Sequence, residues 1–284
     1  MRSRAARHHG RDRFGRIRLH LSRKAFLLGA DLWADQAFLR DVQYQSDVNL
    51  AARQSIYAYQ RPRVDLVASV LDLVELPSSG VVADIGCGNG RYLAELSRRG
   101  LAGRCVGVDL SAGMLTAARS AAPSAGLAVS DAAALPLRDR EAGLTLAMHM
   151  LYHVPDPGAA IGELRRVTRP GGLVIVGLNG SGHMREVRSV IEQAGLGYPR
   201  ERLSLDDGEA LLRGVFPSVT RYDFPAQLQV PGPEPVAAYV RSMSETRKSA
   251  DSEAVVREVM TRIFPGEHAG PVTITTHAGC LVCA

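Results

Sequence analysis

The sequence predicts an α/β fold built on a doubly wound, mostly parallel sheet, and three observations support this. Short apolar runs alternate with amphipathic helical stretches between residues 81 and 194. Runs such as residues 173–176 are continuously apolar, which is typical of parallel strands buried on both faces. The chain has 284 residues, 46% of them hydrophobic, which is enough for one such domain with extensions.

The expected elements follow from these patterns in chain order. Strands are expected at 81–85, 105–109, 128–130, 144–150, 172–178, 218–230 and 273–282. Helices are expected at 50–59, 63–75, 91–99, 112–121, 157–168, 183–194, 236–247 and 252–263. The alternation stops after residue 195, so we expect a helical insertion at about 231–268 that lies over the substrate side.

The N-terminal part differs from the rest in charge. Residues 1–24 hold nine basic residues and one acid, so they carry a charge of +8, whereas the remainder carries −3. We expect a disordered basic arm over 1–24, and an arm that binds nucleic acid is the alternative. Residues 25–76 are expected to form a helical lid or substrate cap, and 77–284 the core.

Glycines at every second position follow the strand predicted at 81–85. Asp84 precedes Gly86, Gly88 and Gly90, and a helix is expected directly afterwards, so backbone N–H groups can approach a ligand closely. A dinucleotide-binding turn would need a third glycine where Arg91 stands. The Asp84 carboxylate would repel a pyrophosphate but can pair with an ammonium group. The spacing therefore favours a cofactor that contains an amino acid.

This stretch, ADIGCGNG at residues 83–90, resembles the first motif of the class I S-adenosylmethionine-dependent methyltransferases. The Arg-Pro-Gly-Gly turn at residues 169–172 is similar to that family as well, and the resemblance extends over about residues 81–178. It implies a Rossmann-like methyltransferase fold with seven strands, of which the last is antiparallel. It also implies S-adenosyl-L-methionine as the cofactor.

Acids at the ends of the next strands supply further cofactor-binding candidates. Asp109 lies 19 residues after Gly90, where an acid can accept hydrogen bonds from ribose hydroxyls. The resemblance implies that Asp131 binds the adenine amino group, although a turn or helix-cap carboxylate is the other interpretation. The candidate cofactor-binding residues are Tyr44, Asp84, Gly86, Gly88, Gly90, Arg91, Asp109, Leu110, Met114, Asp131, Ala132 and His149.

The segment after the fourth strand of the family's pattern contains the catalytic candidates His149, Tyr152 and His153. Because a sulfonium is already a strong electrophile, the protein mainly aligns the reactants, and a base helps only when the nucleophile carries a proton. Packing against the substrate is the alternative role for all three. The candidate substrate-binding residues are Trp33, Tyr44, Tyr152 and His183, which favour an aromatic or heteroaromatic acceptor.

The same segment lacks the motifs of amino-methylating DNA enzymes, the Pro-Cys of cytosine-C5 enzymes and acids for a divalent ion. We therefore expect a metal-free enzyme that acts on a small molecule. Cys280 and Cys283 have zinc-like spacing, but no second ligand pair is evident, so we expect thiols in a terminal strand.

Composition bounds the partners and the location. No apolar run approaches the ~18–20 residues of a membrane span. Only two of the 34 basic residues are Lys, which indicates a GC-rich, bacterial coding sequence. We expect a cytoplasmic monomer or homodimer of bacterial specialised metabolism (natural product biosynthesis) that acts on a small-molecule acceptor, without nucleic acid or membrane as partner. An RNA methyltransferase that uses the basic arm and a non-catalytic S-adenosylmethionine-binding protein are the alternatives.

Overall fold

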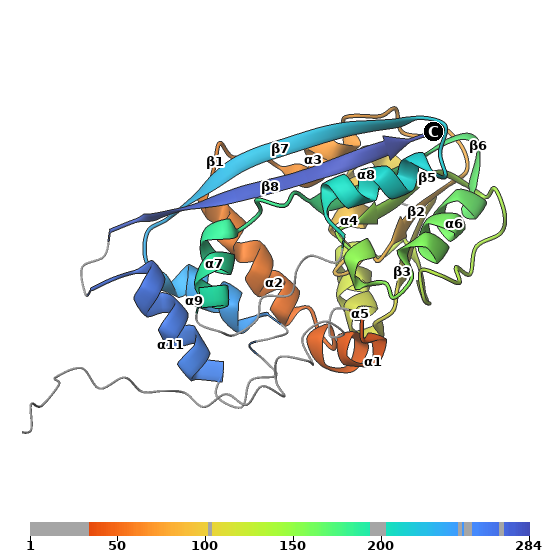
Figure 1. Cartoon of the computed structure of the whole chain (residues 1–284). Coiled ribbons are helices and arrows are strands. Elements are labelled where there is room, and N and C mark those ends of the chain that lie inside the picture. The colour runs from red at the N-terminus through yellow and green to blue at the C-terminus, as the bar shows by residue number, and fades with distance from the viewer. Residues whose placement is uncertain (1–33, 102–103, 194–202, 244–245, 247–251, 267–269) are drawn as a thin grey trace, which may run out of the picture.

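The computed structural model describes residues 34–101, 104–193, 203–243, 246, 252–266 and 270–284, and their strands form one sheet in the order β1-β7-β8-β6-β5-β2-β3-β4 (Figure 1). The strands are β1 (Gln60–Arg61), β2 (Val81–Ile85), β3 (Cys105–Asp109), β4 (Gly126–Val129), β5 (Ala142–Met148), β6 (Thr168–Asn179), β7 (Val219–Val230) and β8 (Val272–Cys283).

Strand directions confirm the predicted fold class. β4, β3, β2, β5 and β6 are parallel neighbours, whereas β8 is antiparallel to both β6 and β7. The described sheet has eight strands rather than seven, because the two-residue β1 pairs antiparallel with β7 at the edge. A strand of two residues has no alternation that a sequence pattern can detect.

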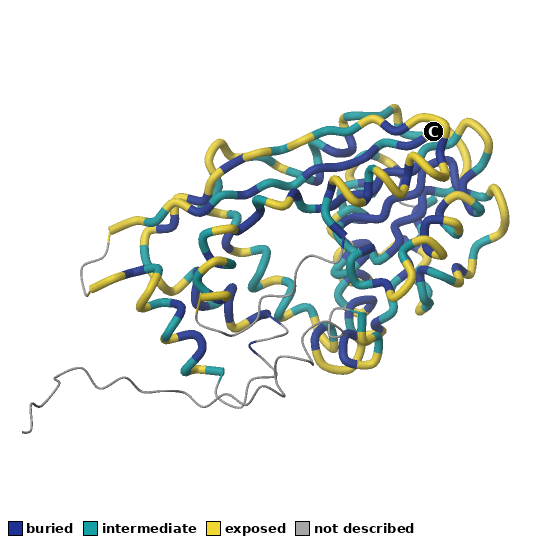
Figure 2. Tube along the Cα trace, viewed as in Figure 1, coloured by how far each residue is buried: buried dark blue, intermediate teal, exposed yellow. Residues whose placement is uncertain are grey.

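Helices cover both faces of the sheet. On one face, α3 (Leu66–Leu71), α4 (Arg91–Leu96) and α5 (Ala112–Ala121) contribute to a core that contains Val82 and Leu146. On the other face, α6 (Pro157–Val167) and α8 (Leu205–Arg213) contribute to a core that contains Ala83 and Ala147. All residues of β5 are buried between these layers (Figure 2). The alternation of neighbouring strand residues between two cores explains the continuous apolar runs.

A third core lies below the far ends of β7 and β8, at the left of Figure 1. It joins η2 (Ile56–Tyr59), α7 (Arg185–Gln193) and the two insertion helices, α9 (Pro233–Arg241) and α11 (Ser252–Ile263). The helix α2 (Val48–Ser55) packs beside it against α9. Ile56, Val187, Val240 and Val259 are buried in it. The insertion and part of the N-terminal segment are therefore packed on one another.

The remaining helical elements are short: α1 (Gln36–Phe38), the π-helical turns η1 (Leu39–Gln43) and η3 (Ser97–Leu101), and the 3-10 turn η5 (Leu151–His153). The helix expected at 63–75 is only α3, which Asp65 caps at its start by accepting a hydrogen bond from Ala68 N. The helix α3 packs in the core on one face of the sheet. The segment 25–76 that was expected to form the lid therefore contains a helix of the core. The predicted basic arm, residues 1–24, lies outside the described residues.

Candidate active site

The site begins where β2 ends in the glycine turn, which we define as residues 84–90. Gly86 and Gly88 have φ angles of +68° and +52°, which side chains disfavour. A Cβ atom on Gly86 would lie 2.7 Å from Met150 Cβ. The backbone N–H groups of Gly86 and Cys87 donate to Val108 O, at 2.7 and 3.0 Å, so the turn is fastened to the end of β3. Gly86 and Gly88 both line a cavity.

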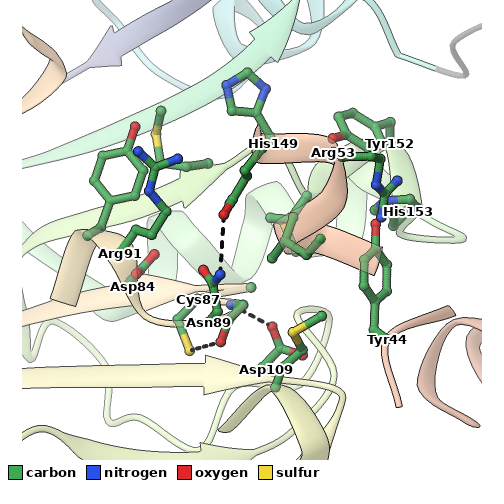
Figure 3. Close-up of a pocket in the computed structure, with 18 of the residues that line it drawn as sticks. Tyr44, Arg53, Asp84, Cys87, Asn89, Arg91, Asp109, His149, Tyr152 and His153 are labelled. Atoms are coloured by element: carbon green, nitrogen blue, oxygen red, sulfur yellow. Dashed lines mark hydrogen bonds between the residues drawn. The ribbon is translucent and has the colours of Figure 1, made fainter. Parts of the chain in front are cut away.

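Asp109, at the end of β3, is held by two backbone donors. Its Oδ2 accepts from Gly88 N and its Oδ1 from Ser111 N, both at 2.9 Å. Burial raises the pKa of Asp109, although its hydrogen bonds with the backbone oppose the shift. The carboxyl group therefore has a fixed orientation beside the glycine turn (Figure 3).

Asp84 is a buried acid without a partner for one of its oxygens. The residue is 1% exposed, and its Oδ2 has no hydrogen-bond partner. Burial, and secondarily the charge of Asp109, raises its pKa to about 7. Because an unpaired buried carboxylate is costly, the site is suited to a cationic ligand group.

Gly90 and Arg91 differ in their relation to the cavity. Arg91, the first residue of α4, lines it. Gly90 is not among the lining residues; it is the N-cap of α4, with φ +80°, and a Cβ there would lie 2.9 Å from Ala118 Cα. The structure therefore places Gly90 in helix packing, where α4 approaches α5, rather than at the cavity surface as expected.

The segment from α1 to η2 closes over the turn. Ser111 Oγ donates to Tyr44 O at 2.6 Å, and Asn89 donates to Gln54 Oε1 at 3.2 Å. A Cβ on Gly113 would collide with Gln45 O. The segment is therefore in contact with both α5 and the glycine turn.

Asp131 follows β4 and lines the cavity together with Ala132, Leu110 and Met114. Its Oδ1 accepts from Ala133 N at 2.9 Å, and its Oδ2 accepts from the Gln36 side chain at 2.6 Å. Asp131 thus makes the hydrogen bonds of a turn carboxylate. It also lines the cavity, where it was expected to bind the adenine amino group.

Tyr44, His153 and Tyr152 form a connected group on the other side of the cavity from Asp84 (Figure 3). Tyr44 Oη and His153 Nε2 are 2.8 Å apart, and the Tyr152 ring meets the His153 ring edge-on at 4.6 Å between centroids. The three candidates therefore lie together, but one ring nitrogen of His153 is already engaged by a phenol.

His149 follows β5 with a φ angle of +55°, an uncommon conformation for a residue with a side chain. Its ring lines the cavity and has no hydrogen bond with another described residue. Burial lowers its pKa to about 4, so the ring is neutral near pH 7 and has a free nitrogen lone pair.

His183 is a wall residue rather than a proton acceptor. Its Nδ1 accepts from His277 N at 3.2 Å, so in the neutral ring the proton is on Nε2, which is 3.1 Å from Tyr57 Oη. Burial lowers its pKa to about 3. Trp33, the remaining substrate candidate, lies outside the described residues.

The cavity has a volume of about 380 Å³, which is suited to a cofactor and a small ligand. Several lining residues were not predicted as site residues, and apart from Asn89 of the glycine turn they come from segments without a motif. They are Gln36, Arg53, Gln54, Tyr57, Asn89, Asn179, Tyr239 and Thr276. The sequence signal that they share is a polar group on the side chain, which surface residues have too.

Of the four cysteines, Cys87 in the glycine turn lines the cavity, whereas Cys105, Cys280 and Cys283 do not. Cys280 and Cys283 are buried, free thiols in β8, in agreement with the expected terminal strand. Within the described ranges, no group of three or more His, Cys, Asp or Glu is arranged to hold a metal ion. No helix in the described part of the chain is long and apolar enough to cross a membrane.

Residues 83–176, from the glycine turn to β6, match the family model described as methyltransferase domain. This region is a class I S-adenosylmethionine-dependent methyltransferase domain. The cofactor of the family is S-adenosylmethionine, and the unpaired Asp84 oxygen and the positive-φ turn whose Gly86 and Gly88 line the cavity fit it.

Relatives of this methyltransferase domain agree with the match. The chain is 33% identical over 113 residues to malonyl-[acyl-carrier protein] O-methyltransferase of Yersinia pestis, with 40% of this chain and 42% of that protein covered. It is 30% identical over 152 residues to an uncharacterised methyltransferase of a Mycobacterium species, with 51% and 60% covered. The chain spans about a third to a half of the length of the first curated relatives.

A solved structure supports the methyltransferase fold. A putative methyltransferase from Bacillus halodurans superposes with a TM-score of 0.56 at 16% identity, with 77% of this chain and 98% of that one covered.

Proposed function

We propose that the chain transfers the methyl group of S-adenosylmethionine to a small-molecule acceptor. The observation that supports this most strongly is the pair of acids beside the glycine turn, the unpaired Asp84 and the oriented Asp109. A non-catalytic binding protein would need the same acids. The residues on the acceptor side of the cavity therefore distinguish a methyltransferase from a binding protein.

Each part of the cofactor has a candidate partner in the cavity. Asp84 binds the ammonium group, and the Asp109 carboxylate accepts hydrogen bonds from the ribose hydroxyls. The residues for the adenine are Leu110, Met114, Asp131 and Ala132. Tyr44, on the segment that closes the cavity, provides an aromatic face near the acceptor.

When bound, S-adenosylmethionine supplies an electrophilic methyl group on a sulfonium, so no metal or oxidant is required. The chain orients the acceptor and excludes water, and the contacts of Ser111 with Tyr44 and of Asn89 with Gln54 keep the segment closed.

His149 is the residue we propose to accept the acceptor's proton. Its ring lines the cavity and makes no hydrogen bond with another described residue, so a ring nitrogen is open to the acceptor. His153 is the weaker candidate, because its Nε2 is engaged by Tyr44 Oη.

The proposed acceptor is aromatic or heteroaromatic, because the phenol rings of Tyr44, Tyr57, Tyr152 and Tyr239 line the cavity. Such rings pack against planar substrates. The proposal covers transfer to oxygen, nitrogen or carbon. A place in specialised metabolism and a cytoplasmic location remain predictions from the sequence.

The test is incubation of the full chain with methyl-labelled S-adenosylmethionine and a panel of aromatic acceptors. We expect S-adenosylhomocysteine to form together with a labelled product, and Gly86→Arg to abolish both because its side chain meets Met150. Cofactor binding without any turnover over the panel would favour the binding protein. Labelling of RNA that depends on residues 1–24 would favour the nucleic-acid alternative.

A further inference from the structure

Arg53, on α2, is a charged group in the cavity to which the proposed function assigns no role. Its guanidinium lies over the Tyr44 ring, 5.2 Å from the centroid. Figure 3 shows it beside Tyr152 and His153, on the opposite side of the cavity from Asp84 and Arg91. Its position is therefore at the acceptor end rather than at the end where we place the ammonium group.

The charge of Arg53 is not neutralised by the described residues. Its Nε and Nη2 atoms are buried and have no hydrogen-bond partner. The ionisable side chains that favour its charged form are the phenols of Tyr44, Tyr152 and Tyr239, and Tyr44 also does so through a side-chain hydrogen bond; no carboxylate is among them. A buried guanidinium with unpaired N–H groups is costly, so its retention points to a ligand.

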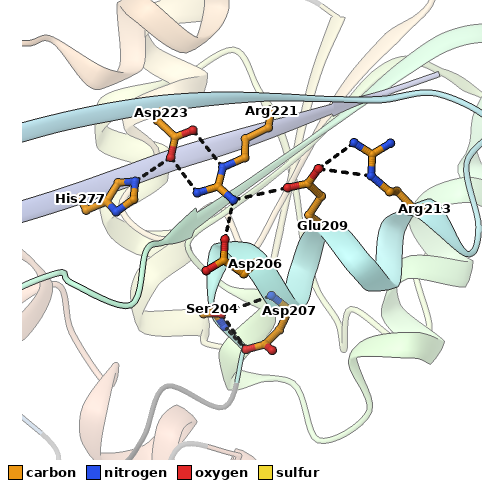
Figure 4. A network of polar contacts seen from close by, with 8 residues as sticks. All are labelled: Ser204, Asp206, Asp207, Glu209, Arg213, Arg221, Asp223 and His277. Atoms are coloured by element: carbon orange, nitrogen blue, oxygen red, sulfur yellow. Dashed lines mark hydrogen bonds and ion pairs between the residues drawn. The ribbon is translucent and has the colours of Figure 1, made fainter.

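The two unpartnered atoms form the edge of the guanidinium that suits a carboxylate. Nε–H and Nη2–H are parallel, and together they can bind both oxygens of one carboxylate. Other arginines of this chain use that edge in this way. Arg221 binds Asp223 through Nε and Nη2, both at 2.9 Å (Figure 4), and Arg98 binds Glu95 at 2.7 and 2.6 Å. Arg53 lines the cavity, and its own Nε and Nη2 atoms have no such partner.

We propose that Arg53 is a specificity-determining residue that binds a carboxylate of the acceptor, so that the substrates are small aromatic acids. This inference rests on the proposed function, because it needs an acceptor in the cavity. The cofactor's own carboxylate is the competing source. In the cofactor, the carboxylate and the ammonium group are bonded to the same carbon. If the ammonium group is at Asp84, the cofactor carboxylate therefore lies near Arg91 and away from Arg53.

The first experiment compares benzoate with the neutral benzamide by calorimetry on the full chain in the presence of S-adenosylhomocysteine. We expect benzoate to bind at least tenfold more tightly, and Arg53→Met to remove this preference. Arg53→Lys should retain part of it, because the charge stays and the two-donor edge is lost. Arg98→Met, on the exposed surface of η3, is the matched control and should leave the preference unchanged. Equal binding of the two probes, or a preference that persists in Arg53→Met, would overturn the proposal.

The second experiment distinguishes the two sources of the carboxylate. S-adenosylhomocysteine is compared with 5′-methylthioadenosine, which lacks the amino acid, on the wild type and on Arg53→Met. We expect the variant to change neither affinity by more than twofold. A tenfold loss for S-adenosylhomocysteine alone would assign Arg53 to the cofactor and overturn the proposal. Failure of the wild type to bind S-adenosylhomocysteine would instead contradict the proposed function.

Folding is checked by thermal unfolding of the same variants. Because Arg53→Met removes a buried charge without a partner, we expect a melting temperature equal to or above that of the wild type. A lower melting temperature would indicate that Arg53 stabilises the fold and would count against a ligand-binding role.

Discussion

At the scale of single residues, the chemistry of the site depends on groups whose protonation is shifted by burial. Asp84 has a pKa raised to about 7, and His149 has one lowered to about 4. In the ligand-free protein, both groups are therefore mostly neutral at pH 5–6, and Asp84 is about half ionised near pH 7. A cationic ligand changes this for Asp84, because it stabilises the ionised form.

Cofactor binding should depend on pH through Asp84. Because its pKa is raised on folding, Asp84 destabilises the ligand-free fold as the pH rises from about 4 through about 7. The ammonium group of the ligand needs the ionised form, so we expect the dissociation constant of S-adenosylhomocysteine to fall about tenfold per pH unit up to pH 7 and then level off. Calorimetry between pH 5 and 8 measures this. Asp84→Asn should bind weakly with a flat profile, and a flat profile in the wild type would count against the assignment.

Replacement of His149 should affect turnover more than cofactor binding. We expect His149→Gln to lower kcat by roughly 10²- to 10⁴-fold for an acceptor that carries a proton, with the affinity for S-adenosylhomocysteine unchanged. Because the pKa of His149 is about 4, its protonation should not lower kcat between pH 7 and 5. Steady-state kinetics of His149→Gln and His153→Gln compare the two bases, and a loss confined to His153→Gln would refute this choice.

At the scale of elements, the closing of the α1–η2 segment over the site depends on a close approach at Gly113. A Cβ at this position would collide with Gln45 O, so Gly113→Ala must displace the segment or α5. We expect a loss of about 1–3 kcal/mol in the free energy of unfolding and weaker binding of S-adenosylhomocysteine.

The matched control is Gly162→Ala, in α6. A Cβ there meets nothing within 4 Å, and alanine favours a helix by about 0.5–1 kcal/mol, so the control should be more stable with unchanged binding. Urea denaturation measures both variants. Equal changes in unfolding free energy and in binding for the two substitutions would show that the close approach of Gly113 to Gln45 is not important.

Elements with a strong local pattern were predictable from the sequence. The structure has β2, β3, α5 and α11 at the expected bounds, because apolar spacing and caps such as Ser111 define them locally. The helix α8 was missed, although Ser204 and Asp207 form a capping box at its start. Its acidic first turn obscured the apolar positions Leu205 and Leu212.

The candidate site was predictable on the cofactor side and less so on the acceptor side. Asp84, Gly86 and Asp109 are close in sequence to strand ends, so their convergence follows from a parallel sheet. Arg53 and Tyr239 reach the cavity only because α2 and α9 pack on one another, and no local pattern encodes such a contact.

At the scale of the whole molecule, the described residues form three hydrophobic cores. Two lie on the faces of the sheet and support the glycine turn, whereas the third joins η2, α7, α9 and α11 beneath β7 and β8. Tyr239 of this third core lines the acceptor side of the cavity, and Arg53 lies there on α2, which packs against α9. Acceptor choice is therefore coupled to the packing of the insertion.

A substitution that removes a buried side chain from the third core should weaken acceptor binding and leave cofactor binding unchanged. We expect Val259→Ala to cost roughly 2 kcal/mol of unfolding free energy, because the residue is fully buried, and to raise the acceptor KM with little change in cofactor affinity. The exposed Val215→Ala is the control and should stay within about 0.5 kcal/mol of the wild type. If Val259→Ala weakened cofactor binding as much as acceptor binding, the proposed link between the third core and the acceptor side alone would be contradicted.

The central claim, that the turn at the end of β2 and Asp109 bind S-adenosylmethionine, is tested most directly by calorimetric titration of S-adenosylhomocysteine into the wild type and Asp109→Ala. Asp139→Ala, at the surface, serves as control. We predict one binding site in the wild type and the control, and affinity weakened by about 10- to 100-fold in Asp109→Ala, since charge-assisted hydrogen bonds contribute about 1.5–3 kcal/mol. Absence of binding in the wild type, or equal affinity in Asp109→Ala, would contradict it.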